Sequence, residues 1–363
     1  MAWRLRRGAR VRALAGPAPW RAHHRAGSDR SEGMTMRILQ VLLSPRIGGA
    51  ESAAAALARE WERSGASCET VYLDDDQPRG AWRRISELRR TLRRISPDVV
   101  VSHSALPNIY ARLASSSQSV YCVLHSATRD FDDRKIRLAE RLLTRRTAAV
   151  IAVSEEQRRE YLSHFPNQRV ELIPNGIPDE FRPGAQYHPG APVITVGRVA
   201  RQKDPDLWAE AAAAVLADRP TVRFEWYGPT MLELEWEDLV ARHSAPDGSV
   251  VFRGPTDHVA TVLRSGSIFF HPSRREAHSV AILEAAASGL PVVCSDSVAE
   301  TLPDWLPRTT FRGGQASDAA RALKETFDDL PLKAAEAALH AANVRDQYGI
   351  ERTAAAYLEV ISR

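Results

Sequence analysis

The sequence predicts an α/β protein of two doubly wound domains that face a cleft, each with a parallel sheet covered by helices. Three observations lead to this fold class. Short apolar, β-rich runs alternate with longer helical runs from residue 36 onward, and the same pattern restarts at residue 193. A segment rich in proline and glycine, residues 174–192, separates the two series. The length of 363 residues suits two domains of roughly 150 residues each.

The apolar runs show no polar alternation, which indicates strands buried on both faces, as in a parallel sheet. In the first series we expect strands at residues 37–43, 68–73, 98–102, 120–125, 149–153 and 170–173. Helices are expected between them, at residues 50–63 and 82–94 among others. In the second series we expect strands at residues 193–196, 222–227, 249–252, 268–270 and 292–295. The segment 331–363 has a helical pattern with a turn signal at Tyr348-Gly349.

These patterns place the domain boundaries. We expect a first domain over residues 34–185, a second over 186–345 and a C-terminal helix over 346–363. Residues 1–33 show no apolar periodicity and are expected to be a disordered, arginine-rich extension, with an organelle transit peptide, or a start at Met34 or Met36, as alternatives. This extension holds eight arginines and two acidic residues, so the other residues share a net charge of about −2 out of the formal +4. The folded part is therefore not basic, and a nucleic-acid partner is not predicted.

Two glycine-containing loops follow the first strand of each series. Gly48-Gly49-Ala50-Glu51 precedes a helix, whose free N-terminal N–H groups and partial positive charge favour an anion. Residues 197–203 hold the equivalent place in the second domain, where Arg198 as a fork and Lys203 as a point charge could grip a diphosphate. Taken alone, each loop is better explained as a tight turn with solvated charges.

Two glutamates lie in the segment after the strand at 268–270. Glu276 falls in a loop, and Glu284 falls near the start of a helix that Ser279 caps and Gly289 ends. Both carboxylates could therefore face the cleft. In isolation they would be explained as one solvated glutamate and one that complements the helix dipole.

The order of the motifs adds a resemblance to this picture. The motifs Gly-Gly-Ala-Glu from Gly48, Pro-Asn-Gly-Ile from Pro174, Gly-Arg-x₄-Lys from Gly197 and Glu-x₇-Glu from Glu276 resemble those of the retaining glycosyltransferases of family 4. The resemblance covers roughly residues 36–363 and is most specific over residues 269–296. It implies the GT-B fold of two Rossmann-like domains, in which a C-terminal helix crosses back onto the first domain.

The resemblance also implies roles for residues of the second domain. Arg198 and Lys203 match the residues that hold the diphosphate of the donor, and Glu284 matches the residue that accepts hydrogen bonds from the ribose. Glu276 matches the carboxylate that holds hydroxyls of the donor sugar. The N–H groups of His278 and Ser279 are expected near the sugar or the phosphates.

In the first domain the resemblance implies acceptor binding and part of the donor site. Gly49 matches the glycine whose backbone closes over the phosphate, and His125 matches a cleft histidine near the donor sugar. His103 and Asn108 follow a strand and could meet the acceptor, although they are equally explained as ordinary polar loop residues. The catalytic set expected from the resemblance is Glu276, His125, Arg198 and Lys203, with no metal.

The predicted function is transfer of a sugar from a nucleoside-diphosphate sugar, with UDP or GDP as the nucleotide, to a hydroxyl acceptor with retention of configuration. The expected acceptor is a glycan, a lipid-linked glycan or a small molecule, and no further cofactor is required. The expected location is the cytoplasm. A basic helix face of five arginines is better explained as a solvated face, and contact with the inner face of a membrane is the alternative; it is formed by Arg134, Arg137, Arg141, Arg145 and Arg146.

Some features depart from the family pattern, and other functions share the fold. Ala277-His278 stands where Gly-Phe is common, which leaves the identity of the donor sugar open. A nucleotide-sugar epimerase, a phosphorylase and a non-catalytic binding protein are alternatives. An NAD-dependent oxidoreductase is a remote one, because residues 48–52 do not form the Gly-x-Gly-x-x-Gly signature of dinucleotide binding.

Overall fold

The computed structural model describes residues 35–45, 48–74, 80–125, 129–184, 190–230, 242–245 and 247–363, all within one unit that begins at Thr35. The extension predicted over residues 1–33 lies outside the described residues. The predicted boundary between the two domains falls among residues 185–189, which also lie outside them. That boundary stays a prediction.

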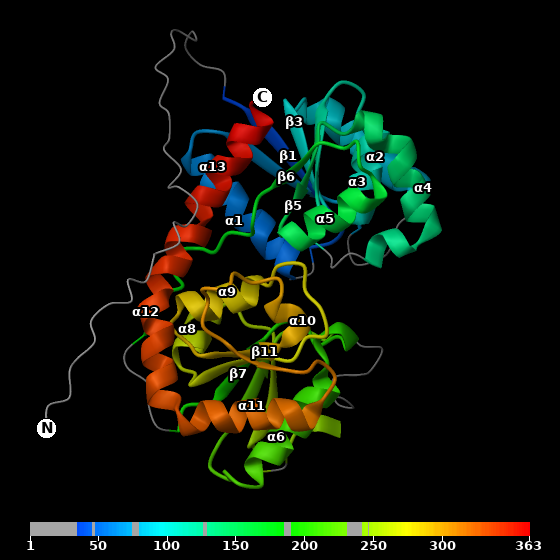
Figure 1. The fold of residues 1–363 in the computed structure, drawn as a ribbon. Helices are drawn as coiled ribbons and strands as arrows, with labels where there is room; N and C mark the ends of the chain where they lie inside the picture. Colours follow the sequence, from blue (N-terminus) through cyan, green and yellow to red (C-terminus); the bar gives the residue numbers. More distant parts are fainter. Residues whose placement is uncertain are drawn as a thin grey trace, which may run out of the picture. The chain divides into compact units, whose positions relative to one another are not determined.

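The first sheet has six parallel strands among the described residues, in the order β2-β1-β3-β4-β5-β6 (Figure 1). Its strands β3 and β5 are buried at every position, and both consist mainly of Val, Ile and Ala. The strands are β1 (Arg37–Leu42), β2 (Ser67–Tyr72), β3 (Val99–His103), β4 (Ser119–Val123), β5 (Ala149–Ala152) and β6 (Val170–Leu172). The helices beside it are α1 (Gly49–Arg63), α2 (Ala81–Ile95), α3 (Ala105–Ala114), α4 (Arg134–Leu143) and α5 (Glu155–His164), with short 3₁₀ turns at η1 (Arg129–Asp132) and η2 (Thr144–Arg146).

The second sheet repeats this plan, again with six parallel strands among the described residues, in the order β12-β11-β10-β7-β8-β9. The strands are β7 (Val193–Val196), β8 (Phe224–Tyr227), β9 (Val250–Gly254), β10 (Ile268–His271), β11 (Val292–Ser295) and β12 (Thr309–Phe311). The helical elements are η3 (Arg201–Lys203), α6 (Pro205–Leu216), α8 (Val259–Arg264), α9 (Val280–Ala287), α10 (Asp296–Ala299), α11 (Ala316–Asp328), α12 (Leu330–Tyr348) and α13 (Ile350–Ile361). Two doubly wound sheets confirm the predicted fold class.

Both sheets reverse their strand order at one point. In the first sheet β2 lies on one side of β1 and β3 on the other, and in the second sheet β8 and β10 flank β7 in the same way. Ligands of open α/β sheets bind beyond the carboxyl ends of the strands at such a switch point. The fold therefore points to the loops after β1 and β3 and the loops after β7 and β10.

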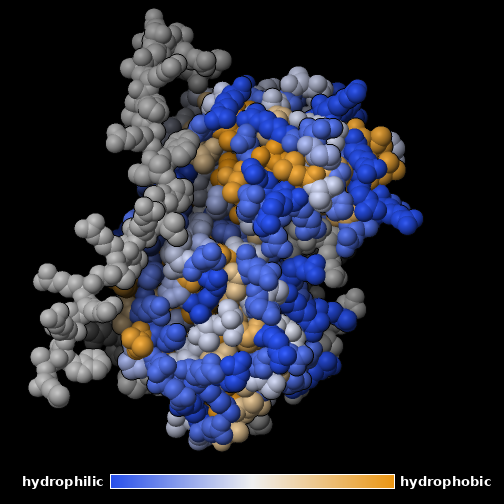
Figure 2. Space-filling model, in the orientation of Figure 1, coloured by the Kyte–Doolittle hydropathy of each residue, from blue (hydrophilic) through white to orange (hydrophobic). Residues whose placement is uncertain are grey.

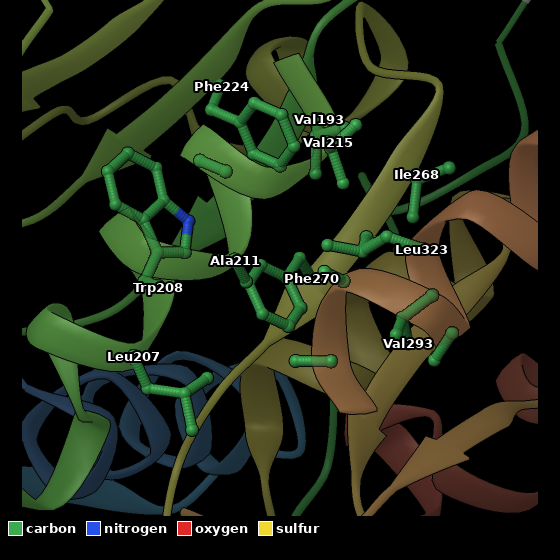
Figure 3. Close-up of a cluster of buried hydrophobic side chains, with 14 of the residues drawn as sticks. Val193, Leu207, Trp208, Ala211, Val215, Phe224, Ile268, Phe270, Val293 and Leu323 are labelled. Carbon is green, nitrogen blue, oxygen red and sulfur yellow. The ribbon is translucent and has the colours of Figure 1, made fainter. Parts of the chain in front are cut away.

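The core of the second sheet fixes the strands that carry these loops. Figure 3 shows Trp208 of α6, Phe270 of β10 and Leu323 of α11 in one buried cluster. The indole Nε1 of Trp208 donates to Thr195 Oγ1 at 2.9 Å, which satisfies its polar atom inside the apolar cluster. The hydroxyl of Thr195 in turn donates to the Phe270 carbonyl at 2.7 Å, so β7 and β10 are tied together next to the switch point.

The C-terminal helices return to the first sheet, as predicted. Figure 1 shows α12 running past the second sheet and α13 lying against α1. The Trp61 indole on α1 donates to the Ala354 carbonyl at 3.2 Å, and its ring meets Tyr357 edge-on at 5.7 Å. Where α12 gives way to α13, Ile350 N donates to the Ile177 carbonyl at 2.9 Å. Gly176 permits this close crossing, because a Cβ there would lie 2.7 Å from Thr353 Oγ1.

Candidate functional site

A cavity of about 390 Å³ lies at the carboxyl ends of the strands of both sheets. This volume is in the range of small-molecule binding sites. The first sheet contributes the start of α1 and the ends of β3 and β4, and the second contributes the loops after β7, β8 and β10 and the start of α9. The sequence-predicted site residues that line the cavity are Gly49, His103, His125, Arg198, Lys203, Glu276, His278, Ser279 and Glu284.

The two glycine loops meet at Gly48 and Arg198. Helix α1 begins at a glycine N-cap, which supplies no side-chain hydrogen bond to the first turn. A Cβ at Gly48 would lie 2.5 Å from Glu51 Oε2 and 3.4 Å from Cζ of Arg198, whereas a Cβ at Gly49 would meet no atom within 4 Å. Gly48 thus lies in contact distance of Arg198 in the other loop, and Gly49 leaves open space in the cavity wall.

Glu51 is a site residue to which the sequence analysis assigned no role, although it stands in the first motif. It lies in the first turn of α1 and lines the cavity. Burial raises the pKa of Glu51, and a backbone hydrogen bond and the Arg198 guanidinium partly offset this rise. The carboxyl group of one half of the site thus interacts electrostatically with the cation of the other half.

Lys203 and Glu276 form an ion pair in which Nζ lies 2.5 Å from Oε1. The same carboxylate oxygen lies 3.2 Å from His271 Nε2, and because a carboxylate only accepts, that ring nitrogen carries the proton. Burial raises the pKa of Glu276, but Lys203 and His271 outweigh burial and hold it well below its usual range. Glu276 is therefore ionised and held from two sides. His271, at the end of β10, is the second site residue that sequence reasoning missed.

The loops that carry Lys203 and Glu276 are also joined directly. Gln202 Nε2 donates to the Arg275 carbonyl at 2.7 Å, and Arg274 N donates to the Gln202 carbonyl at 2.9 Å. The positions of the cation and the carboxylate are thus set by hydrogen bonds between the two loops as well as by their own charge.

Helix α9 begins at the cavity. Ser279 is its N-cap, as predicted, and its hydroxyl accepts from Ile282 N at 3.4 Å. Asn175, in the Pro-Asn-Gly-Ile motif, donates to the His278 carbonyl at 3.0 Å and so fixes the segment before the helix. Glu284 lies in the second turn of α9 and lines the cavity. Burial, and then the Glu180 carboxylate, raise its pKa to about 8.

His103 and His125 lie at the ends of β3 and β4 and contact each other. His103 Nδ1 lies 2.9 Å from His125 Nε2, and His103 Nε2 lies 2.8 Å from Gln40 Oε1 on β1. His103 has both ring nitrogens engaged by the protein although it borders the cavity. Burial lowers the pKa of His125 to about 4, so this ring is neutral at physiological pH.

Asn108 is the predicted site residue that the structure does not bring to the cavity. Its side chain is 2% exposed, accepts from Ser102 Oγ at 2.6 Å and donates to the Val123 carbonyl at 3.2 Å. Both ends of the amide thus connect α3 to β3 and β4. These contacts favour the alternative that the sequence left open, a polar residue that serves the fold.

Two family models match the chain. Residues 47–181 match the model described as Glycosyltransferase Family 4, and residues 191–329 match the model described as Glycosyl transferases group 1. Together the two matches span most of the chain, and each includes cavity-lining residues from one of the two halves of the site.

Individual relatives are similar over parts of the sequence. A phosphatidylinositol N-acetylglucosaminyltransferase component from Arabidopsis thaliana is 32% identical over 170 residues, which cover 45% of this chain and 37% of that protein. An Escherichia coli galactosyltransferase, named for UDP-Gal and a GlcNAc-diphosphoundecaprenol acceptor, is 24% identical and covers 63% of this chain and 64% of its own. The matched region thus spans less than two thirds of either curated relative.

A solved structure shows the same fold along its whole length. HepE of Anabaena, in a crystal structure with UDP and glucose, has a TM-score of 0.74 at 17% identity and covers 90% of this chain and 100% of that one. With both family models and this fold in agreement, the chain belongs to family 4 of the glycosyltransferases and has the GT-B fold.

Proposed function

We propose that the protein transfers a sugar from a nucleoside-diphosphate sugar to a hydroxyl group of an acceptor, with retention of anomeric configuration. The observation that carries this proposal is one cavity lined by two cations, Arg198 and Lys203, and two carboxylates, Glu276 and Glu284. The cations suit the diphosphate of a sugar nucleotide, and the carboxylates suit its ribose and sugar hydroxyls. UDP is the nucleotide we favour, because a solved structural neighbour holds UDP and a curated relative is named for a UDP-sugar.

Each charged group has a task in this reaction. When the bond from the sugar to the diphosphate breaks, negative charge builds on the leaving phosphate, and Arg198 and Lys203 stabilise it without reorganisation. Glu284 accepts hydrogen bonds from the ribose hydroxyls. Glu276, already held by Lys203 and His271, accepts from hydroxyls of the donor sugar.

The contacts of Glu276 disfavour this residue as a covalent nucleophile. Its carboxylate is occupied by an ammonium and an imidazole, which lower its pKa and its tendency to form a covalent bond to carbon. We infer that the acceptor hydroxyl attacks on the face that the diphosphate leaves, and that the leaving phosphate takes up the proton of the acceptor. A covalent adduct between the sugar and Glu276 would contradict this mechanism.

Nucleotide binding tests the donor site. A nucleoside diphosphate at 100 times its Kd stabilises the folded state by about 2.7 kcal/mol, which a thermal-shift assay detects. We expect UDP to raise the melting temperature more than GDP, ADP, dTDP or NAD. Because the ribose hydroxyls donate to an ionised Glu284, binding expels its proton, so the shift should grow as the pH rises toward about 8 and level off above it.

The Glu284→Gln variant is the matched control for this test. It should bind UDP more weakly and lose the dependence on pH in this range, because glutamine has no proton to release. A shift by NAD alone, or by none of the nucleotides, would contradict the donor site. Conversion of the nucleotide sugar without any acceptor would point to an epimerase instead.

We also propose that the acceptor is carried by a membrane and that α4 contacts the membrane surface. Among the described residues, no helix has the length and apolar content to span a bilayer. Glu140 holds α4 inward, because it pairs with the fully buried Arg112 at 3.0 Å. The other face of α4 exposes Leu138 and Leu142, which are 58% and 73% exposed.

Basic residues surround these leucines, which is the pattern of a helix that lies in a membrane surface. The exposed ones on and just after α4 are Arg134, Lys135, Arg141, Arg145 and Arg146. Figure 2 shows hydrophobic residues beside strongly hydrophilic ones on the side where Figure 1 labels α2, α3 and α4. Two of the relatives are named for lipids, phosphatidylinositol and diphosphoundecaprenol, which supports a lipid-linked acceptor.

Vesicle sedimentation tests this contact. We expect the full chain to sediment with vesicles that contain phosphatidylglycerol, less so at high salt, and the double variant Leu138→Ser, Leu142→Ser to lose most of this binding. The control is Leu332→Ser, Leu339→Ser on α12, where two leucines are 69% and 77% exposed. Both variants keep residues 1–33, so an equal loss in both, or no loss in the first, would contradict a role of α4.

A further inference from the structure

A chain of buried hydrogen bonds runs across three neighbouring strands of the first sheet and ends at the cavity. Gln40 on β1 donates from Nε2 to the Ala54 carbonyl at 2.9 Å, and its Oε1 lies 2.8 Å from His103 Nε2 at the end of β3. His103 Nδ1 then lies 2.9 Å from Nε2 of His125, which follows β4. Gln40 and His103 are 0% and 1% exposed, so the protein itself must satisfy their polar atoms.

The direction of every bond in this chain follows from its first member. A backbone carbonyl only accepts, so the amide nitrogen of Gln40 faces Ala54 and its oxygen faces His103. An amide oxygen also only accepts, so His103 carries its proton on Nε2 and leaves Nδ1 bare. His125 must then donate from Nε2 to that bare nitrogen. The Nδ1 atom of His125 is left with a lone pair, and it has no hydrogen bond to any described residue.

We propose that Gln40 and His103 are positioning residues that fix His125 as a hydrogen-bond acceptor toward the ligand in the cavity. This proposal rests on the proposed function, because a sugar is the ligand it concerns. A sugar hydroxyl can donate to Nδ1 of His125. A phosphate or carboxylate oxygen has no proton to donate, so its lone pairs would be repelled by the lone pair of Nδ1. The chain of bonds thus selects a neutral, hydroxyl-bearing face of the donor sugar at this point and disfavours an acidic sugar that presents its carboxylate there.

The hydrogen-bonded chain of Gln40, His103 and His125, here called the relay, differs from a purely structural set of buried polar residues in the effect of its loss. Without the Gln40 oxygen, a proton on His103 Nε2 would be buried with no acceptor, so the proton would move to Nδ1 and point toward His125. His125 would then accept at Nε2 and carry its own proton on Nδ1, the atom left for the ligand. The ring would stay in place, but its polarity toward the cavity would be reversed.

Ring-nitrogen NMR of the ¹⁵N-histidine-labelled full chain tests this directly, with signals assigned from His103→Gln and His125→Gln. In the unchanged protein we expect both rings to be protonated at Nε2 and bare at Nδ1. In Gln40→Met, which keeps the length of the side chain, we expect both protons to move to Nδ1. The matched control is Cys68→Ala, because Cys68 also contacts Gln40 Nε2, at 3.5 Å, but takes no part in the relay. A protonated Nδ1 on His125 in the unchanged protein, or an unchanged pattern in Gln40→Met, would overturn the proposal.

Kinetics separate a positioning role from a loss of structure. We expect Gln40→Met to raise the KM for the donor sugar nucleotide about tenfold and to leave the Kd for the nucleoside diphosphate unchanged, since only the sugar meets His125. Equal weakening of both ligands would indicate a general structural defect and overturn the proposal. If no variant and no wild-type protein binds a sugar nucleotide, the proposed function fails, whereas the proton positions seen by NMR remain a separate result.

Discussion

Replacing Arg198 with alanine is expected to lower kcat/KM by about 10²–10³-fold and to leave the melting temperature unchanged. The effect is expected to be large because Arg198 lines the cavity, where its guanidinium can donate two parallel hydrogen bonds to the diphosphate. The stability is expected to hold because the Arg198 side chain is exposed and its charge lies next to Glu51 across the cavity rather than inside a core.

The matched control for this variant is Arg201→Ala. Arg201 is also exposed, belongs to the same loop and does not line the cavity. Steady-state kinetics should show little change for Arg201→Ala, since a general loss of positive charge is not what the reaction depends on. Equal losses in the two variants would mean that the loop acts through its net charge, and an unchanged kcat/KM in Arg198→Ala would remove this residue from the diphosphate site.

Much of the fold could be predicted because its signals are local. The strands β3, β5, β10 and β11 each begin with a run of apolar residues that needs no distant partner to be recognised. The Ser279 cap and the Gly289 stop of α9 are likewise encoded within one short segment. The strand β12, by contrast, has three residues with one buried, which is too short to show a period. Its place at the sheet edge is set by its pairing with β11.

Site residues that belong to a sequence motif could be predicted, whereas residues that join the site through contacts with distant parts of the chain could not. Arg198, Lys203, Glu276 and Glu284 stand at strand and helix ends that the sequence marks. Gln40 could not be found this way, because it lies inside an apolar strand and meets His103 across 63 positions of the sequence. The pairing of Lys203 with Glu276 spans 73 positions and depends on how two loops fold toward each other, which no local pattern encodes.

The second large effect is expected at this ion pair. Lys203→Met should lower the free energy of unfolding by about 3 kcal/mol and abolish transfer, because it leaves the Glu276 carboxylate in a site where only 12% of its side chain is exposed. We place the effect at the low end of the range for buried pairs, since the Lys203 side chain is 17% exposed. Chemical denaturation measures the loss. The control Lys324→Met breaks a surface pair with Asp218 and should change stability far less than Lys203→Met does.

The double variant Lys203→Met, Glu276→Gln separates stability from chemistry. With no buried charge left unpaired, it should regain most of the lost stability and still transfer no sugar. The pH dependence has a fixed sign: the folded-state pKa of Glu276 is lowered, so the pair stabilises the protein above the ordinary value of 4.5 and loses its effect as the pH falls below it. The difference between the wild type and the double variant should therefore shrink in acid. If Lys203→Met were instead as stable as the wild type, the ion pair would contribute nothing to folding. The role of Lys203 would then be limited to binding the diphosphate.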